Sequence, residues 1–209
     1  MTWEDNPENP QLAVPAPPWQ MSGTMAMGIF RLTRPPEVPA PLRRVTPRHI
    51  AVVVIRYRTG TLSYDEFVIG LPVRHGPQVG ICVTSIWVND QTSLQGGRRL
   101  WGLPKQPARF AWTRNGVEIT DRAGDLASIC TSPGRLSTPP ISLEILSFNA
   151  PDRAVTRTTS RLHAPWTAAR LQADHWSPLL PPLSQGTTRF AAVANPFTLT
   201  INGPERLDQ

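Results

Sequence analysis

The sequence contains almost no lysine. Of its 21 basic residues, Lys105 is the only lysine, and the other 20 are arginines. An arginine side chain stays protonated and forms no imine under ordinary conditions, whereas a lysine amine can lose its proton and attack a carbonyl group. Lys105 is therefore the first candidate for covalent chemistry. The alternative is that a compositional preference for arginine has left one lysine by chance.

Residues that hold metals and cofactors are also sparse. The two cysteines, Cys82 and Cys130, do not form a Cys-x-x-Cys pair and predict small buried side chains rather than a disulfide framework. The four histidines are dispersed and predict no metal site. The pair Gly96-Gly97 lacks the strand-to-helix setting and third glycine of a dinucleotide motif. We therefore expect neither a metal nor a cofactor.

Long apolar runs are absent as well. No stretch of 18 apolar residues occurs, so we expect no transmembrane helix and no membrane partner. The segment 1–10 has neither the basic region nor the apolar core of a secretory signal. These features predict a soluble cytoplasmic protein.

The charge balance is basic, with a formal net charge of +6 and an isoelectric point near 10.6. Such a balance raises the possibility of nucleic-acid binding, which depends on phosphate contacts. The arginines are scattered, however, and never run longer than the pairs Arg43-Arg44 and Arg98-Arg99. An arginine-driven nucleic-acid binder therefore ranks last among the functions considered, and we expect no nucleic-acid partner.

Proline is abundant, with 24 residues against 14 glycines. This load disfavours long helices and is typical of short strands joined by turns. Residues 1–20 are polar and proline-rich, and they predict an extended N-terminal arm docked by Trp19. We expect residues 21–209 to form a single domain.

Short apolar segments separated by turn signals predict a mainly β fold. The expected strands cover residues 50–57, 66–73, 79–88, 108–112, 126–130, 141–148, 189–194 and 197–201. The pair Asn115-Gly116 predicts a hairpin turn with positive φ at both central residues. Only residues 93–100 and 167–172 favour short helices. The pattern predicts an antiparallel barrel or a closed sandwich.

The sequence around Lys105 favours a reactive amine. Pro104 fixes its own φ and biases Leu103 to an extended conformation, so Lys105 is presented from a stiff loop. Apolar neighbours such as Trp101 and Phe110 would desolvate the amine, and desolvation disfavours the ammonium form. The alternative is an exposed lysine whose stem lies on Trp101.

Two motifs occur in the middle of the chain. The stretch from Asp90 to Lys105 includes Gly97-Arg98 and ends in Pro104-Lys105, similar to the signature loop of the acetoacetate decarboxylase family. Upstream, Tyr64-Asp65-Glu66 opens an apolar strand that ends in Pro72-Val73, similar to the Tyr-x-Glu strand of the family. The resemblance covers about residues 60–113. It implies an antiparallel double-cone barrel with few short helices.

The resemblance also implies roles for individual residues. Lys105 occupies the position of the lysine that forms a Schiff base with a keto acid, and Glu66 matches a glutamate of the active-site cavity. Glu66 would position the substrate or carry a proton, although a glutamate at the start of a strand is more often exposed. The substrate pocket is predicted to include Trp87, Arg98, Trp101, Leu103 and Gln106. Members of the family assemble into oligomers, so we expect a homo-oligomer.

The sequence departs from the decarboxylating members at three points. Gln106 stands where they carry a second lysine, residues 51–54 include no second glutamate, and Arg31 is the nearest candidate for their N-terminal arginine. The sequence therefore predicts a Schiff-base-forming lyase that acts on a small keto acid, by decarboxylation or by aldol or dehydration chemistry. The alternative is a non-catalytic small-molecule-binding protein of the same fold.

Overall fold

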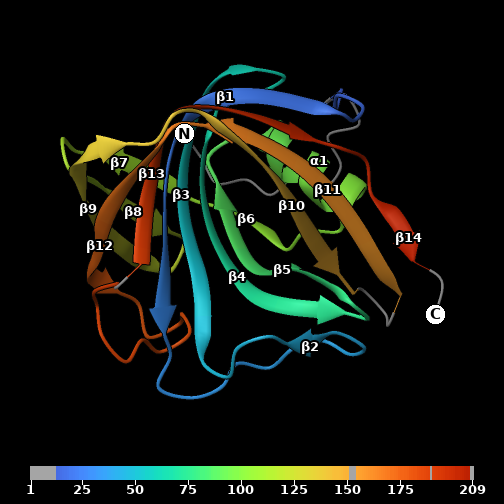
Figure 1. Ribbon diagram of the computed structural model, residues 1–209, viewed down its shortest axis with the longest axis horizontal. Helices are drawn as coiled ribbons and strands as arrows, with labels where there is room; N and C mark the ends of the chain where they lie inside the picture. Colours follow the sequence, from blue (N-terminus) through green and yellow to red (C-terminus); the bar gives the residue numbers. More distant parts are fainter. Residues whose placement is uncertain (1–12, 151–153, 189, 208–209) are drawn as a thin grey trace.

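The computed structural model describes residues 13–150, 154–188 and 190–207, and most of them lie in β-strands (Figure 1). The strands of the first half are β1 (Trp19–Arg31), β2 (Arg43–Arg44), β3 (His49–Gly60), β4 (Asp65–His75), β5 (Gln78–Val88), β6 (Lys105–Pro107) and β7 (Arg109–Trp112). The strands of the second half are β8 (Gly116–Asp121), β9 (Gly124–Ser137), β10 (Ile141–Asn149), β11 (Val155–Ala164), β12 (Trp166–Trp176), β13 (Phe190–Ile201) and β14 (Glu205–Leu207). The helix of the described residues is α1 (Gln91–Trp101). No helix in this part of the chain is long and apolar enough to cross a membrane.

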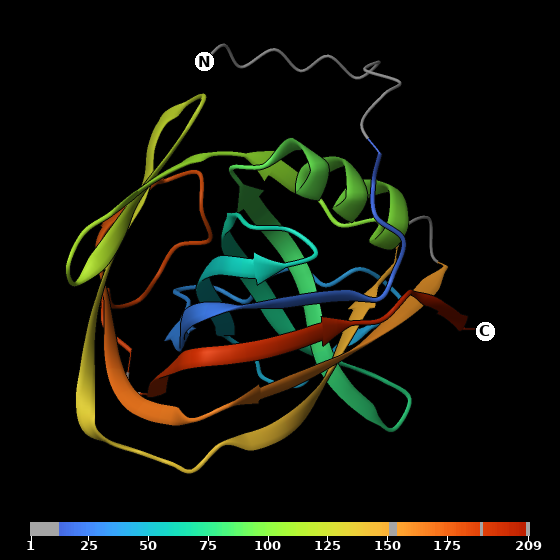
Figure 2. The same cartoon turned by 90° about the horizontal axis from the view of Figure 1, so that it is seen from above.

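Seven strands close into a barrel. Their order is β11, β10, β5, β4, β3, β1 and β13, and pairing of β13 with β11 closes the ring, as at Leu199 and Leu162. Neighbours in the ring are antiparallel except for β10 and β5. Strands β1 and β13 lie side by side although they come from opposite ends of the chain (Figure 2). The predicted mainly antiparallel β-barrel with few helices is confirmed.

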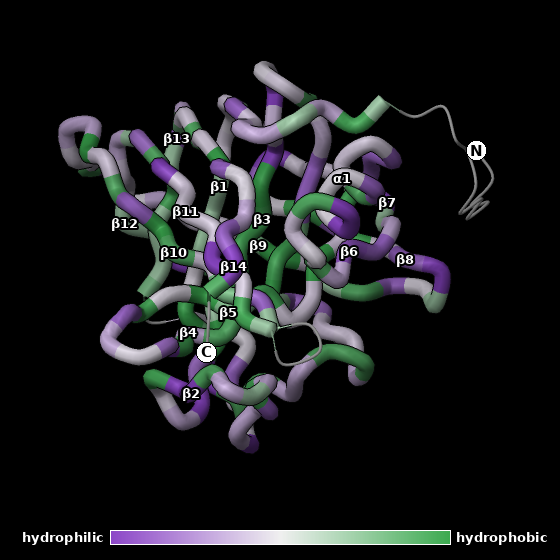
Figure 3. Tube along the Cα trace, turned by 90° about the vertical axis from the view of Figure 1, so that its right-hand side faces the viewer, coloured by the Kyte–Doolittle hydropathy of each residue, from purple (hydrophilic) through white to green (hydrophobic). Residues whose placement is uncertain are grey.

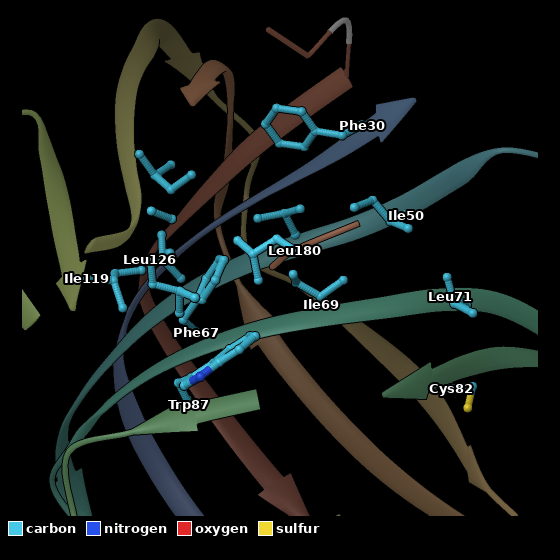
Figure 4. Close-up of a cluster of buried hydrophobic side chains, with 14 of the residues drawn as sticks. Phe30, Ile50, Phe67, Ile69, Leu71, Cys82, Trp87, Ile119, Leu126 and Leu180 are labelled. Atoms are coloured by element: carbon cyan, nitrogen blue, oxygen red, sulfur yellow. The ribbon is translucent and has the colours of Figure 1, made fainter. Parts of the chain in front are cut away.

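A second sheet continues from the barrel. Strand β13 also pairs with β12, and the sheet runs on through β9 and β8 to β7. A hydrophobic cluster joins Phe67 and Trp87 of the barrel to Ile119 and Leu126 of this second sheet (Figure 4). The barrel strands β3 and β4 therefore have a packed face outside the barrel as well as one inside it.

The sequence of β3 is apolar almost without interruption because both faces of the strand are buried. In Figure 3 it is largely hydrophobic. Ile50, Val52 and Val54 pack in the outer cluster, while Ala51 and Val53 face the barrel interior. Successive side chains point to opposite faces of a strand, so a strand buried on both faces loses the usual alternation of polar and apolar residues.

Two expectations from the sequence are corrected. Residues 167–172 form part of β12 instead of a helix, because β9 and β13 on either side supply backbone partners that override local helix propensity. The hairpin at Asn115-Gly116 exists, but Gly116 already belongs to β8, where a Cβ would lie 2.3 Å from the carbonyl oxygen of Ile129. Gly116 therefore allows β8 to approach β9 closely, and it does not provide a positive φ.

The strand pattern also differs at the two ends of the chain. Strands β1 and β11 were not predicted, and the two strands expected at residues 189–194 and 197–201 correspond to the single strand β13. Of the predicted arm, residues 1–12 lie outside the described residues. Trp19 is buried at the start of β1, and its indole Nε1 donates a hydrogen bond of 2.8 Å to the carbonyl oxygen of Pro15.

Candidate active site

Lys105 is held at one end of the barrel between β5 and α1. It opens β6, which pairs in parallel with β5 opposite Ile86. Its carbonyl oxygen accepts a hydrogen bond of 2.8 Å from Nε of Arg98, and its amide donates one of 2.8 Å to the carbonyl oxygen of Leu103. Lys105 is only 3% exposed. The alternative of an exposed loop lysine is therefore wrong.

The ammonium group of Lys105 has two polar partners. Its Nζ lies 2.8 Å from Oε2 of Glu66 and donates a second hydrogen bond of 2.8 Å to Oγ of Ser93. The ring of Tyr64 lies alongside, with its centroid 5.1 Å from Nζ. Both members of the ion pair are buried. Such a pair needs further hydrogen bonds to offset the cost of removing its charges from water.

Two tyrosines supply these bonds to Glu66. The hydroxyl of Tyr57 donates to Oε1 at 3.3 Å, and the hydroxyl of Tyr64 donates to Oε2 at 3.2 Å. Burial first, and then the charge of Glu66, raise the pKa of both phenols well above the usual value. Both therefore stay protonated and act as donors at physiological pH. They fix the carboxylate beside Lys105.

Helix α1 approaches Lys105 through a glycine. The helix begins after Asp90, whose Oδ1 accepts a hydrogen bond of 2.6 Å from the amide of Ser93, and it ends at Trp101, followed by the cap residue Gly102 with a φ of 62°. A Cβ on Gly97 would lie 2.5 Å from both Cδ and Cε of Lys105. The absence of a side chain at Gly97 therefore makes room for the lysine stem.

Aromatic side chains pack beside the same end of the barrel. Trp19 and Trp101 form an edge-to-face pair with centroids 4.7 Å apart. The indole Nε1 of Trp101 donates to the carbonyl oxygen of Asn202 at 2.8 Å, and Nδ2 of Asn149 donates to the carbonyl oxygen of Trp101 at 3.0 Å. These bonds tie the end of α1 to the barrel strands.

The interior of the barrel is a cavity of about 280 Å³. All seven barrel strands contribute to its lining, and Lys105 and Glu66 are the charged residues that face it in the described part of the chain. The volume is near the lower end of the range of about 300–1,000 Å³ typical of small-molecule sites. A larger hollow of about 700 Å³ lies along residues 35–44, where the lining residues are mostly exposed. It lacks a buried ionisable pair, so the barrel cavity is the better candidate.

Two of the five predicted pocket residues line the cavity. Trp101 and Leu103 face it. Trp87 instead stacks on Phe67 in the outer cluster, with centroids 5.4 Å apart (Figure 4). The alternation of β5 and β4 turns both rings to the outer face, so the prediction for Trp87 is wrong.

The predictions for Arg98 and Gln106 as pocket residues are also wrong. Arg98 is exposed and reaches the backbone of Lys105, not the cavity. Gln106 follows Lys105 on β6, and because successive side chains alternate, it points outward and is exposed. Arg31, the candidate for an N-terminal substrate-binding arginine, is exposed at the end of β1.

The sequence analysis missed Tyr57 and Ser93 as members of the site. Tyr64 was available from the Tyr-x-Glu spacing, because residues two apart in an extended segment share a face. Ser93 had a weaker signal as the third residue after the helix cap Asp90. Tyr57 had none, because it enters through pairing of β3 with β4. Among the described residues, no group of three or more His, Cys, Asp or Glu side chains is placed to hold a metal ion.

Fold and site together define a β-barrel protein with a buried lysine–carboxylate pair facing an apolar cavity. A family model described as acetoacetate decarboxylase (ADC) matches residues 6–125, which is more than half of the chain. The chain therefore belongs to the acetoacetate decarboxylase family.

A curated relative supports the same assignment. An acetoacetate decarboxylase from Acidiphilium cryptum is 33% identical over 79 residues, which cover 34% of this chain and 32% of that protein. The matched part therefore spans about a third of the curated relative.

Solved structures share the fold. The enduracididine biosynthesis enzyme MppR, complexed with the condensation product of pyruvate and imidazole 4-carboxaldehyde, has a TM-score of 0.70 at 13% identity, covering 99% of this chain and 96% of that chain. Acetoacetate decarboxylase from Legionella pneumophila has a TM-score of 0.66 at 17% identity, covering 93% and 88%. An acetoacetate decarboxylase-like enzyme from Sphingomonas wittichii has a TM-score of 0.66 at 15% identity, covering 95% of each chain. The predicted barrel type is confirmed.

Proposed function

We propose that the protein is a lyase in which Lys105 forms an imine with the carbonyl group of a keto acid. The observation that carries this proposal is the position of Nζ, buried at the wall of an apolar cavity and 2.8 Å from a carboxylate oxygen of Glu66. A buried lysine that faces a ligand cavity next to a proton acceptor has the features of an activated amine nucleophile. Membership of the acetoacetate decarboxylase family supports the same chemistry.

Glu66 is placed to manage the protons of this reaction. When substrate fills the cavity, a proton passes from Nζ to Oε2 of Glu66, and the neutral amine attacks the carbonyl carbon. A carbon–nitrogen bond forms, and the carbonyl oxygen leaves as water after taking up protons. The resulting protonated imine draws electrons from the adjacent carbon. Tyr57 and Tyr64 hold the carboxylate in place throughout.

The imine then reacts in one of two ways. In decarboxylation, the electron pair of the bond to the carboxylate moves toward the imine nitrogen, carbon dioxide leaves, and the enamine carbon takes a proton that Glu66 has first taken up from solvent water. In aldol chemistry, Glu66 instead takes a proton from the carbon next to the imine, and the resulting enamine carbon attacks an aldehyde, whose oxygen takes up that proton. The reverse sequence releases the aldehyde. Hydrolysis by water then frees Lys105 in both cases. That MppR has been captured with pyruvate and with a pyruvate condensation product supports keeping both reactions within the proposal.

Borohydride trapping tests the imine directly. The protein is incubated with acetoacetate or pyruvate, reduced, and digested for mass spectrometry. Lys105 is the only lysine, so an adduct maps without ambiguity. The matched control is Lys105→Arg, which keeps the cation beside Glu66 but forms no imine. Trapping on Lys105 with loss of signal in the control is the expected result. Absence of any adduct on Lys105 with a range of carbonyl compounds would overturn the proposal and favour a non-catalytic binding protein.

Measurement of released carbon dioxide distinguishes decarboxylation from aldol chemistry. An enzyme that decarboxylates acetoacetate releases carbon dioxide in a Lys105-dependent manner. An enzyme restricted to aldol chemistry forms the imine with pyruvate but yields a condensation product only when an aldehyde is added.

A further inference from the structure

The cavity offers no cation to a substrate apart from the catalytic amine itself. The chain carries 20 arginines, yet no arginine or histidine of the described residues lines the barrel interior. Arg98 and Arg31 both lie outside it, as described above. A carboxylate brought into the cavity therefore finds a partner only within reach of Lys105. Farther along the barrel it would be buried without a counter-charge, which is strongly unfavourable.

The wall formed by β1, β3 and β4 becomes entirely apolar with distance from the ion pair. Cross-strand pairing aligns its side chains in layers, and Met25 and Ile55 share the layer of Glu66. The next two layers are Met27, Val53 and Val68, and then Ile29, Ala51 and Gly70. Gly70 lies four positions after Glu66 on β4, which corresponds to about 13 Å at about 3.3 Å per residue of strand. The cavity is thus long enough for an extended chain.

The opposite wall adds a few uncharged polar groups to a lining that is otherwise mostly apolar. Ser147 of β10 and Thr158 and Ser160 of β11 face the cavity with hydroxyl groups. Hydroxyls can bond a neutral oxygen of a ligand, but they do not neutralise a carboxylate. The distribution of charge therefore selects against a ligand with a charged far end and leaves the apolar wall free to bind a hydrocarbon chain.

We propose that the substrate is a carbonyl compound with an uncharged apolar chain of medium length on its carbonyl carbon. The chain lies along β1, β3 and β4, and the carbonyl group meets Lys105. If the substrate is a keto acid, its carboxylate lies next to the carbonyl group and its other end is apolar. This inference rests on the proposed imine chemistry for the position of the carbonyl, while the chain preference follows from the cavity alone.

Matched aldehydes test the preference. Hexanal and 6-oxohexanoate have the same aldehyde and chain length, but only the second ends in a carboxylate, and propanal supplies a short reference. The aldehyde forms a carbon–nitrogen bond with Nζ and loses water, and borohydride reduces the imine to a stable secondary amine. Because burial of each methylene favours binding about fourfold, we expect half-maximal trapping of Lys105 at a hexanal concentration at least tenfold below that of propanal. For 6-oxohexanoate we expect a concentration at least tenfold above that of hexanal.

Two substitutions at neighbouring positions test where the apolar chain of the substrate lies in the cavity. Ala51→Leu fills the layer farthest from Glu66, whereas Val52→Ile adds one methylene on the outer face of the same strand. We expect Ala51→Leu to lower the preference for hexanal over propanal at least fivefold and Val52→Ile to leave that preference unchanged. Should Ala51→Leu fail to fold, the three aldehydes on the native protein still decide the question.

Unreactive alcohols separate this inference from the imine proposal. We expect 1-hexanol to raise the melting temperature of the protein by mass action and 6-hydroxyhexanoate to leave it unchanged. If the alcohols are discriminated but no aldehyde is trapped, the imine proposal fails and the chain preference stands. If aldehydes are trapped but hexanal, propanal and 6-oxohexanoate behave alike, the chain preference is overturned and the imine proposal stands.

Discussion

At the scale of single residues, the pairing of Lys105 with Glu66 makes a definite prediction for Glu66→Gln. The substitution keeps the shape of the side chain but leaves the buried cation without its counter-charge. Breaking a buried pair from one side costs about 3–5 kcal/mol of unfolding free energy. We expect a loss of about that size in urea denaturation, together with loss of imine trapping.

The double variant Glu66→Gln with Lys105→Met is the control for this loss. It removes both charges, so we expect most of the lost stability to return, since replacing a buried pair by neutral groups is often nearly neutral. A single variant Glu66→Gln as stable as the native protein would contradict the view that the ion pair is electrostatically coupled.

The two phenols bound to Glu66 predict a decline of stability at high pH. Both have a pKa raised by burial and by Glu66, so the folded state keeps their protons when the unfolded state begins to lose them near pH 10. Stability is therefore complete below that pH and falls above it, by about 1.4 kcal/mol per pH unit for each tyrosine. The double variant Tyr57→Phe with Tyr64→Phe should lack this part of the decline.

Urea denaturation of both proteins at pH 8 to 11 checks the tyrosine prediction. Burial also raises the pKa of Cys82 to about 11, which adds a decline from about pH 9 in both proteins. The difference between the two curves isolates the phenols. If the unfolding free energies of the two proteins fall in parallel above pH 10, the tyrosine prediction is contradicted.

At the scale of elements, the contact of α1 with Lys105 reverses the usual effect of glycine in a helix. Replacing a helical glycine by alanine commonly stabilises by about 1 kcal/mol. In Gly97→Ala, however, the added methyl would lie 2.5 Å from the lysine stem. We expect Lys105 to be displaced and the rate of imine trapping to fall at least tenfold.

Gly96→Ala is the matched control on the same helix. Its methyl would lie 2.6 Å from the ring of Trp19 and does not meet Lys105. We expect a stability loss of about 1–3 kcal/mol from overpacking, with trapping retained. If both variants trap carbonyl compounds at the native rate, Gly97 has no part in placing the lysine.

The elements also show how far sequence reasoning reaches. The strand at residues 50–57 was predictable because burial on both faces makes it apolar throughout. The helix expected at 167–172 was wrong because pairing with β9 and β13 decides the conformation of β12. Those partners are distant in sequence, and local propensity carries no record of them.

The candidate site likewise contains some residues that the sequence reveals and others that only the fold reveals. Lys105 and Glu66 were identified from sequence motifs, and the structure brings their side chains together. Trp87 was misplaced because its side depends on the register of β5 against β4, which includes an irregularity near Gly70. Tyr57 reaches Glu66 across the pairing of β3 with β4, and no local pattern marks it.

At the scale of the whole molecule, closure of the barrel depends on β13. This strand pairs with β1, β11 and β12, so it joins β1 to β11 in the ring and anchors the second sheet. We predict that a chain ending at residue 188 does not fold to the native state, because it opens two edges of the barrel and removes Phe197 and Leu199 from the inner core. Exposed edges of this kind favour association between chains.

A chain ending at Gly203 is the control for the truncation. It loses β14, which pairs only with β11 among the described strands, and keeps the carbonyl oxygen of Asn202 that binds Trp101. We expect it to give a cooperative urea transition and to retain trapping at Lys105, whereas the shorter chain shows neither and elutes as aggregates in gel filtration. Because β13 also supplies Leu199 and Ile201 to the cavity wall, folding of the barrel and formation of the substrate site are one event. A shorter chain that still folded cooperatively would show that the remaining strands can close without it.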